Sequence, residues 1–259
     1  MNPLVSVVMT AYNAADTIAE AIESVLRQEG VDLELIIVDD GSTDGTADVI
    51  RTITDPRVRL DQPGRLGRPA AMNRAVEIAR GPLIAINDAD DTSFPERLHK
   101  HAGFLTEHPE IDVVGGQVLA YWGDKEWRLR YPLTHDPIVE ELERRRMPIA
   151  HCTVMMRRGW FVANGGLDTT LARVEDFELY FRCRRSTGFA ALSDDLVRYR
   201  FRPLTYQQWL RDRQFYLKSV GLNGSSFAAP LGYAKYRAVL WTQRQGLGLT
   251  SRQSKISTD

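Results

Sequence analysis

Short apolar segments that alternate with longer amphipathic segments run through the first 110 residues and constrain the fold most strongly. The predicted strands are residues 5–9, 35–38, 58–60 and 83–86. The predicted helices begin near Asp16 or Thr17, at Ser42 or Thr43, after the loop at residues 64–69, and at Pro95. Apolar strands that alternate with helices are typical of a mostly parallel sheet covered on both faces. The sequence therefore predicts an α/β fold.

The alternation becomes looser after residue 110. We expect strands at residues 113–114, 118–121, 149–156 and 190–201, and helices at residues 174–185, 206–216 and 234–243. These elements suggest an α/β domain over residues 1–202, with halves at 1–110 and 111–202. A helical extension follows over residues 203–259, and basic residues strongly outnumber acidic ones there. In the helix from Pro95, we expect His99 and His101 to be solvated.

The composition argues against several classes of protein. Hydrophobic residues make up 43% of the 259 residues and charged residues 26%, which is typical of a globular domain rather than a disordered chain. A net charge of −1 argues against a dedicated nucleic-acid-binding protein. Cys152 and Cys183 cannot form a disulfide framework, so we expect them to pack as small apolar groups in a reducing compartment. The sequence shows no signal peptide and no apolar run of about 20 residues, so we expect a cytoplasmic location.

Three carboxylates follow the strand predicted at residues 83–86. Asp88 and Asp90 alternate along the chain and so lie on the same side, where both can reach one ligand, and Asp91 comes next. Carboxylates are hard oxygen donors that suit Mg²⁺ or Mn²⁺, and such an ion keeps open positions for phosphate oxygens. The alternative is a solvated acidic turn that caps the following helix. One acid would serve that purpose, so three favour a binding site.

Two other groups of polar residues follow neighbouring strands. Asp39 and Asp40 can accept hydrogen bonds from a nucleobase, although they can equally belong to a helix cap. Thr10 and Tyr12 follow the first strand, where the tyrosine ring can stack on a base or simply pack. Ligands of parallel α/β sheets bind outside the carboxyl ends of the strands. The convergence of these groups in one crevice therefore favours a nucleotide site.

Taken in order, these segments resemble the family 2 glycosyltransferases of the GT-A fold. The resemblance rests on residues 5–13, on VDDGSTD at residues 38–44, and on DADD at residues 88–91 followed by PERL at residues 95–98. Residues 174–182 resemble the ED motif of the family, and HCTVM at residues 151–155 resembles a segment of the spore-coat glycosyltransferase type. The resemblance makes residues 1–110 the nucleotide-binding half and residues 111–202 the acceptor-side half.

The resemblance implies a role for each candidate residue. The residues implied in nucleotide binding are Thr10, Ala11, Tyr12, Asp39, Asp40, Arg68, Asp88 and Ala89, with Arg65 as the alternative to Arg68. Asp90 is implied as the metal ligand and Asp176 as the catalytic base, although position alone leaves Asp176 open as an acid favoured by the helix dipole. The residues implied in support of the site or of the acceptor pocket are Asp91, His151 and Glu175.

The resemblance also implies a reaction, the inverting transfer of a sugar from a UDP-sugar to an acceptor hydroxyl with Mn²⁺ or Mg²⁺ bound. The expected acceptor is a carbohydrate or lipid-linked molecule in cell-surface polysaccharide or glycoconjugate synthesis. Polymerising members carry a Gln-x-x-Arg-Trp motif, and residues 207–211 have similar letters in the wrong order, so we expect transfer of a single sugar. The Arg-Asn pair common in the family is Met72 and Asn73 here, which leaves the phosphate-facing arginine open.

Two other functions stay open from the sequence. A sugar-1-phosphate nucleotidyltransferase would share the fold, nucleotide and metal, but it normally carries a glycine-rich segment with Lys or Arg after the first strand. A non-catalytic nucleotide-sugar or carbohydrate binding module would need no base at Asp176. The glycine-rich motifs of dehydrogenases and P-loop proteins are absent from the sequence. The basic extension suggests peripheral contact with the inner face of a membrane, a helical cap or a homodimer contact.

Overall fold

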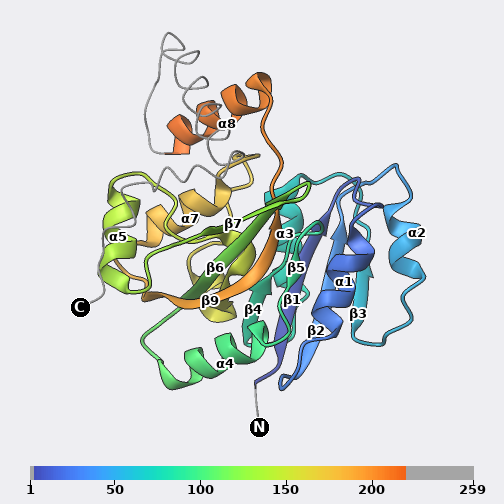
Figure 1. The fold of residues 1–259 in the computed structure, drawn as a ribbon, viewed down its shortest axis with the longest axis horizontal. Coiled ribbons are helices and arrows are strands. Elements are labelled where there is room, and N and C mark those ends of the chain that lie inside the picture. Colours follow the sequence, from blue (N-terminus) through green and yellow to red (C-terminus); the bar gives the residue numbers. More distant parts are fainter. Residues whose placement is uncertain (1–2, 220–259) are drawn as a thin grey trace.

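A computed structural model describes residues 3–219, and the helix expected at residues 234–243 lies outside them. The described strands form one nine-stranded sheet in the order β3-β2-β1-β4-β8-β6-β9-β5, with β7 paired to β6 (Figure 1). The strands are β1 (Val5–Ala11), β2 (Leu33–Asp39), β3 (Val58–Asp61), β4 (Leu83–Ile86), β5 (Thr92–Ser93), β6 (Val113–Trp122), β7 (Lys125–Leu129), β8 (Met155–Arg157) and β9 (Phe189–Arg200). The helices are α1 (Ile18–Leu26), α2 (Thr46–Arg51), α3 (Arg68–Glu77), α4 (Arg97–Glu107), α5 (His135–Glu143), α6 (Arg158–Ala163), α7 (Glu175–Cys183), α8 (Tyr206–Ser219) and the short 3₁₀ helix η1 (His151–Thr153).

The first half of the chain builds the parallel part of the sheet, β3-β2-β1-β4. Every residue of β2 is buried, because helices cover both faces: α3 packs in one apolar cluster, and α1 and α4 pack in the other. The register pairs Ala11 with Asp39 and Val8 with Ile86. The carboxyl ends of β1, β2 and β4 therefore meet at one edge of the sheet, and the predicted α/β architecture is confirmed.

The second half of the chain departs from the parallel pattern. β8 is antiparallel to β4 and β6, β7 is antiparallel to β6, and β5 is antiparallel to β9, while β6 and β9 run parallel. The sheet as a whole is therefore mixed, with four neighbouring parallel strands in the first half and one parallel pair, β6 and β9, in the second. β7 returns from β6 through the two-residue turn of Gly123 and Asp124. So short a connection joins antiparallel strands, whereas a parallel strand needs a long crossover.

Tertiary contacts move the ends of two predicted elements. α2 begins at Thr46 rather than at Ser42 or Thr43, because the Ser42 hydroxyl accepts a hydrogen bond from the Asn13 N–H and the Thr43 N–H donates to the Asn13 side chain. The strand expected at residues 149–156 contains η1 and is extended only from Met155. The elements β5, β7, α5 and α6 have no counterpart among the predicted ones.

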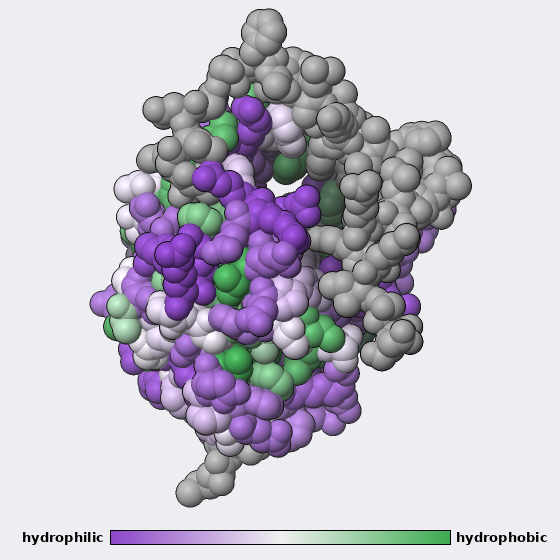
Figure 2. Space-filling view, turned by 90° about the vertical axis from the view of Figure 1, so that its left-hand side faces the viewer, coloured by the Kyte–Doolittle hydropathy of each residue, from purple (hydrophilic) through white to green (hydrophobic). Residues whose placement is uncertain are grey.

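The residues after 202 begin with α8, which lies beside α7 (Figure 1). The Tyr216 hydroxyl donates to the Arg145 carbonyl at 2.5 Å, and its ring lies against Phe177 of α7. On the face drawn in Figure 2, the described side chains are mainly hydrophilic, with hydrophobic ones scattered among them. Within residues 3–219, no helix is both long enough and apolar enough to span a bilayer.

Helix α4 buries a histidine that the sequence pattern places in solvent. His101 is fully buried and its Nε2 lies 3.0 Å from the Gly115 carbonyl oxygen, so the expectation of a solvated residue is wrong, whereas His99 is exposed as expected. Burial, together with the nearby charge of Arg97, lowers the pKa of His101 to about 3. The ring is therefore neutral at pH 7 and packs as part of the core.

Arg97, one turn before His101, is also fully buried. Its Nη1 donates to Asn87 Oδ1 at 3.0 Å and to Ser93 Oγ at 2.8 Å, and its Nη2 donates to the Ile86 carbonyl. Asn87 and Ser93 lie on either side of the acidic segment at residues 88–91. The buried guanidinium therefore fixes the backbone that carries the predicted metal site.

Replacing Arg97 with Met should lower the free energy of unfolding by about 2–3 kcal/mol, because buried oxygen acceptors lose their donor. Urea denaturation checks this value. Arg27→Met is the matched control, since Arg27 is 65% exposed and pairs with Glu23 on the surface. The control should change stability by less than about 0.5 kcal/mol. Equal stability of the two variants would contradict the bracing role of Arg97.

Candidate active site

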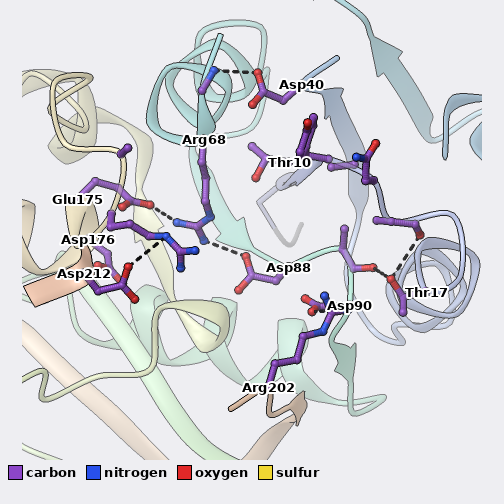
Figure 3. A pocket seen from close by; sticks show the side chains of 18 of the residues that line it. Thr10, Thr17, Asp40, Arg68, Asp88, Asp90, Glu175, Asp176, Arg202 and Asp212 are labelled. Carbon is purple, nitrogen blue, oxygen red and sulfur yellow. Dashed lines mark hydrogen bonds and ion pairs between the residues drawn. The ribbon is translucent and has the colours of Figure 1, made fainter. Parts of the chain in front are cut away.

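The carboxyl ends of β1, β2 and β4 open into a cavity of about 700 Å³ (Figure 3). The predicted site residues that line it are Thr10, Ala11, Tyr12, Asp40, Arg68, Asp88, Ala89, Asp90, Glu175 and Asp176. Three other predicted residues do not line it, namely Asp39, Asp91 and His151. The structure thus brings together residues from both halves of the chain.

Tyr12 and Asp40 form one end of the cavity. Tyr12 is 50% exposed and the Arg65 guanidinium lies 3.6 Å from the centre of its ring. Asp40 is buried and accepts hydrogen bonds from the N–H groups of Leu66 at 2.6 Å and Gly67 at 2.9 Å, and it forms an ion pair with Arg65 at 2.7 Å. A flat ring and a fixed carboxylate therefore lie together at this end, and Arg65 is the arginine that contacts both.

Asp39 does not line the cavity, and both of its carboxylate oxygens accept hydrogen bonds from residues outside it. Its Oδ1 accepts a hydrogen bond from the Ser42 N–H at 3.0 Å, and its Oδ2 accepts one from Gln62 at 3.2 Å. Successive side chains of a strand project to opposite sides, and at the end of β2 only Asp40 lines the cavity. Asp39 instead supports the loop that follows β2.

Asp88 and Asp90 follow β4, and both project into the cavity (Figure 3). Asp88 forms an ion pair with Arg68 at 2.9 Å, and Asp90 pairs with Arg202 at 3.3 Å. Burial raises the pKa of Asp90, and the neighbouring Asp88 raises it further. Burial acts in the same direction on Asp88, but Arg68 and other cations outweigh it and lower the pKa of that carboxyl.

Asp91 lies beneath the cavity and supports its floor. It is fully buried, and its Oδ1 accepts a hydrogen bond from the Arg200 N–H at 2.8 Å. Burial, reinforced by Asp88, raises the pKa of Asp91 to about 8. On the other side of the acidic segment, the Thr17 hydroxyl donates to the Ala89 carbonyl at 2.9 Å. These contacts tie the acidic segment to β9 and to the start of α1.

Asp176 lies in the first turn of α7, on the side of the cavity opposite Thr17 (Figure 3). Val174, immediately before the helix, has a φ of 59°, a left-handed conformation that is strained for a β-branched residue. Burial raises the pKa of Asp176 and Asp88 adds to the effect, although Arg68 and the Phe177 N–H act against it. A raised pKa makes this carboxylate a stronger base than an exposed aspartate.

Arg68 joins the two walls of the cavity (Figure 3). Its Nη2 contacts Asp88 at 2.9 Å, and its Nη1 forms an ion pair with Glu175, which is 2% exposed. The guanidinium therefore connects the end of β4 with the start of α7. Met72 is fully buried in the core, so a side chain at that position does not face the cavity.

His151 lies behind the cavity wall rather than in the cavity. It is 7% exposed, and its Nδ1 lies 2.7 Å from the Tyr180 hydroxyl of α7. Burial and the charge of Arg68 lower the pKa of His151 to about 4, so the ring is neutral at pH 7. The residue supports α7, and its neighbour Cys152 is buried as expected.

Sequence reasoning missed three charged residues of the cavity, Arg173, Arg202 and Asp212. Arg173 and Asp212 pair at 3.4 Å, which brings α8 to the edge of the site. Arg202 comes directly after the strand predicted at residues 190–201. In the structure, the parallel pairing of β9 with β6 brings the carboxyl end of β9 to the cavity. The sequence predicted β6 only as two short strands, so this pairing was not foreseen.

The donor atoms present fit a divalent cation held together with phosphates. Among residues 3–219, no group of three or more His, Cys, Asp and Glu side chains is arranged around a common point. Asp90 and Asp88 nevertheless share the cavity, and Asp88 raises the pKa of Asp90, an effect that a nearby cation would oppose. Mg²⁺ and similar ions are commonly held by one or two carboxylates, with phosphates and water completing the coordination. Asp90 lines the cavity and could hold such an ion.

The fold is that of the GT-A glycosyltransferases, as comparison with solved structures shows. TarS of Staphylococcus aureus (residues 1–349, in complex with UDP) matches with a TM-score of 0.65 and 19% identity, over 95% of this chain and 75% of that one. The mannosyltransferase PcManGT of Pyrobaculum calidifontis, in complex with GDP-Man and Mn²⁺, matches with a TM-score of 0.63 and 20% identity, over 95% and 72% of the two chains.

The sequence profile of glycosyl transferase family 2 matches residues 6–163, so the chain belongs to glycosyltransferase family 2. The succinoglycan biosynthesis protein ExoO of Rhizobium meliloti is 50% identical over 147 residues, which cover 53% of this chain and 42% of ExoO. The protein EpsE of Bacillus subtilis is 36% identical over 188 residues, which cover 70% of this chain and 66% of EpsE. The chain thus aligns with less than two thirds of each of these two relatives. The resemblance inferred from the motifs is confirmed.

Proposed function

We propose that the chain is a metal-dependent, inverting glycosyltransferase that moves a single sugar from a UDP-sugar to an acceptor hydroxyl. The acceptor is a carbohydrate or a lipid-linked molecule in the synthesis of a cell-surface polysaccharide or glycoconjugate. The observation that carries the proposal is the shared cavity, in which Asp40, Asp90 and Asp176 lie on separate walls. Asp40 is therefore suited to bind a nucleotide, Asp90 to bind a cation and Asp176 to act as the catalytic base, all around one cavity.

The nucleotide end is the one formed by Tyr12 and Asp40. The tyrosine ring offers a flat surface to a base, and a buried carboxylate accepts an N–H such as that of uracil. Thr10, Ala11 and Ala89 line the cavity between this end and Asp88, which we assign to the ribose. The TarS complexes with UDP and UDP-GlcNAc and the PcManGT complex with GDP-Man support a nucleotide-sugar donor.

Asp90 holds Mn²⁺ or Mg²⁺ in this proposal, with Asp91 supporting the segment from below. When bound, the ion supplies charge neutralisation for the departing diphosphate. Asp176 accepts the proton of the acceptor hydroxyl, whose oxygen attacks the anomeric carbon on the face opposite the nucleotide. One displacement of this kind inverts the anomeric centre. Arg68 and Glu175 keep the start of α7, and with it Asp176, at a fixed place relative to Asp88.

Family membership favours this function over a sugar-1-phosphate nucleotidyltransferase, and a base at Asp176 favours it over a pure binding module. We retain residues 1–202 as the transferase domain and residues 203–259 as a basic extension. The extension contributes to the site through Asp212 of α8.

A thermal-shift panel of UDP-, dTDP- and GDP-sugars, each with and without Mn²⁺, tests the proposal. A UDP-sugar with Mn²⁺ should stabilise the protein most, by about 2.7 kcal/mol when the ligand is at 100 times its Kd. The matched variant Asp40→Asn should lose most of this gain, because the carboxylate that accepts the base N–H is gone. If no nucleotide sugar stabilises the protein, or if chelation of the metal leaves the shift unchanged, the proposal is wrong.

A further inference from the structure

Arg202 is a cavity residue that neither the motifs nor the proposed reaction uses. The backbone immediately before it is fixed, because the Arg200 N–H donates to Asp91 at 2.8 Å and the Phe201 N–H donates to the Tyr121 carbonyl at 2.9 Å. Arg202 is therefore held at the acidic segment by β9, and its side chain reaches Asp90 (Figure 3).

The ion pair between Arg202 and Asp90 is suited to exchange. The closest nitrogen–oxygen distance is 3.3 Å, and the two side chains are 64% and 31% exposed. An ion pair so open to water contributes little to stability, so a divalent cation can displace the guanidinium from Asp90 at small cost. The ion pair between Arg68 and Glu175 differs, because Glu175 is almost fully buried. If Arg68 moved away, the Glu175 carboxylate would remain as an unpaired buried charge, which is strongly destabilising.

The charges of the cavity indicate where the displaced guanidinium goes. Of the residues that the structure describes, six carboxylates and four guanidiniums line it. Each guanidinium has a partner: Arg65 pairs with Asp40, Arg68 with Asp88 and Glu175, Arg173 with Asp212, and Arg202 with Asp90. A donor diphosphate adds negative charge beside Asp90, and a guanidinium binds phosphate oxygens in bidentate fashion. Arg202 is the arginine whose carboxylate partner the cation would take.

We propose that Arg202 occupies Asp90 in the donor-free enzyme and moves to the donor diphosphate when Asp90 exchanges it for the divalent cation. This inference rests on the proposed function, because it takes Asp90 as the metal ligand. Arg202 thereby limits binding of the metal alone and binds the diphosphate in the loaded site, so that cation and nucleotide sugar bind together. The residue is a diphosphate-binding group contributed by the segment that follows β9.

The test measures binding of Mn²⁺ alone to the full chain by electron paramagnetic resonance, and binding of UDP at saturating Mn²⁺ by calorimetry. Arg202→Gln should tighten the binding of Mn²⁺ alone by about two- to five-fold, because its competitor is lost. The same variant should weaken UDP binding by about 10- to 100-fold, because a charged hydrogen-bond donor to the diphosphate is gone. A residue with a purely structural role would not improve one affinity while impairing the other.

Arg198→Gln is the matched control, because it removes the same charge from β9 at a residue that pairs with Glu126 outside the cavity. It should change neither affinity. If Arg202→Gln leaves Mn²⁺ binding unchanged or weaker, or leaves UDP binding unchanged, the exchange is wrong. Asp90→Asn separates this failure from that of the proposed function: if this variant binds Mn²⁺ as the unmodified protein does, the metal role of Asp90 itself fails.

Discussion

Asp176→Asn should lower the rate of sugar transfer by about 10³-fold or more while leaving UDP affinity within about two-fold of the unmodified protein. The amide has nearly the shape of the carboxylate but cannot accept the proton of the acceptor hydroxyl. Asp40 lies apart from Asp176 and keeps its contacts with Arg65, Leu66 and Gly67 (Figure 3). The loss should therefore fall on kcat, whereas the donor KM should hardly change.

The measurement is steady-state transfer over a range of pH, combined with calorimetry of UDP binding. Because burial raises the pKa of Asp176, the rate should fall on acidification at a higher pH than the ordinary aspartate pKa of about 3.9 would give. Glu178→Gln is the matched control, since Glu178 lies on the same helix and pairs with Arg182. Full activity of Asp176→Asn, or equal losses in both variants, would place the base elsewhere.

Asp90→Asn should remove the metal dependence of nucleotide binding and lower transfer by about 10²- to 10³-fold, since the charge on the leaving diphosphate loses its counterion. An amide oxygen is a much weaker ligand for a hard cation than a carboxylate. The fold should be retained, because Asp90 lies on the cavity surface and its pair with Arg202 is open to water. UDP titrations with Mn²⁺ and with a chelator give the dependence directly.

Asp194→Asn provides the control for Asp90→Asn, because Asp194 pairs with Lys100 and does not line the cavity. It should retain both the transfer rate and the effect of Mn²⁺. If Asp90→Asn binds UDP more tightly with Mn²⁺ than without it, as the unmodified protein is expected to, then another group holds the cation.

The parts of the fold that depend on local sequence were predictable. β4 has the predicted bounds, because an apolar run of four residues ends at Asn87 and can only be buried as a strand. The acids that follow the parallel strands were placed correctly at one edge, since parallel strands bring their carboxyl ends together. Asp39 was grouped with Asp40 but does not line the cavity, and the alternation of side chains along β2 already separates the two residues.

The remainder depends on contacts that the sequence does not encode locally. Buried Arg97 and His101 look like a solvated helix face until their partners, Asn87 and the Gly115 carbonyl, are known. The start of α2 is set by Asn13, which comes from a different loop. Arg202 acquires its place only through the pairing of β9 with β6, a contact between residues far apart in the chain.

The central claim is that a cation on Asp90 and a nucleotide against Tyr12 and Asp40 occupy the same cavity. Anomalous diffraction from crystals grown with Mn²⁺ and UDP tests it most directly. We expect a manganese peak within coordination distance of an Asp90 carboxylate oxygen, with the diphosphate next to it and the nucleobase beside Tyr12. A peak on another cluster of acids, or a nucleotide bound away from the ends of β1, β2 and β4, would contradict it.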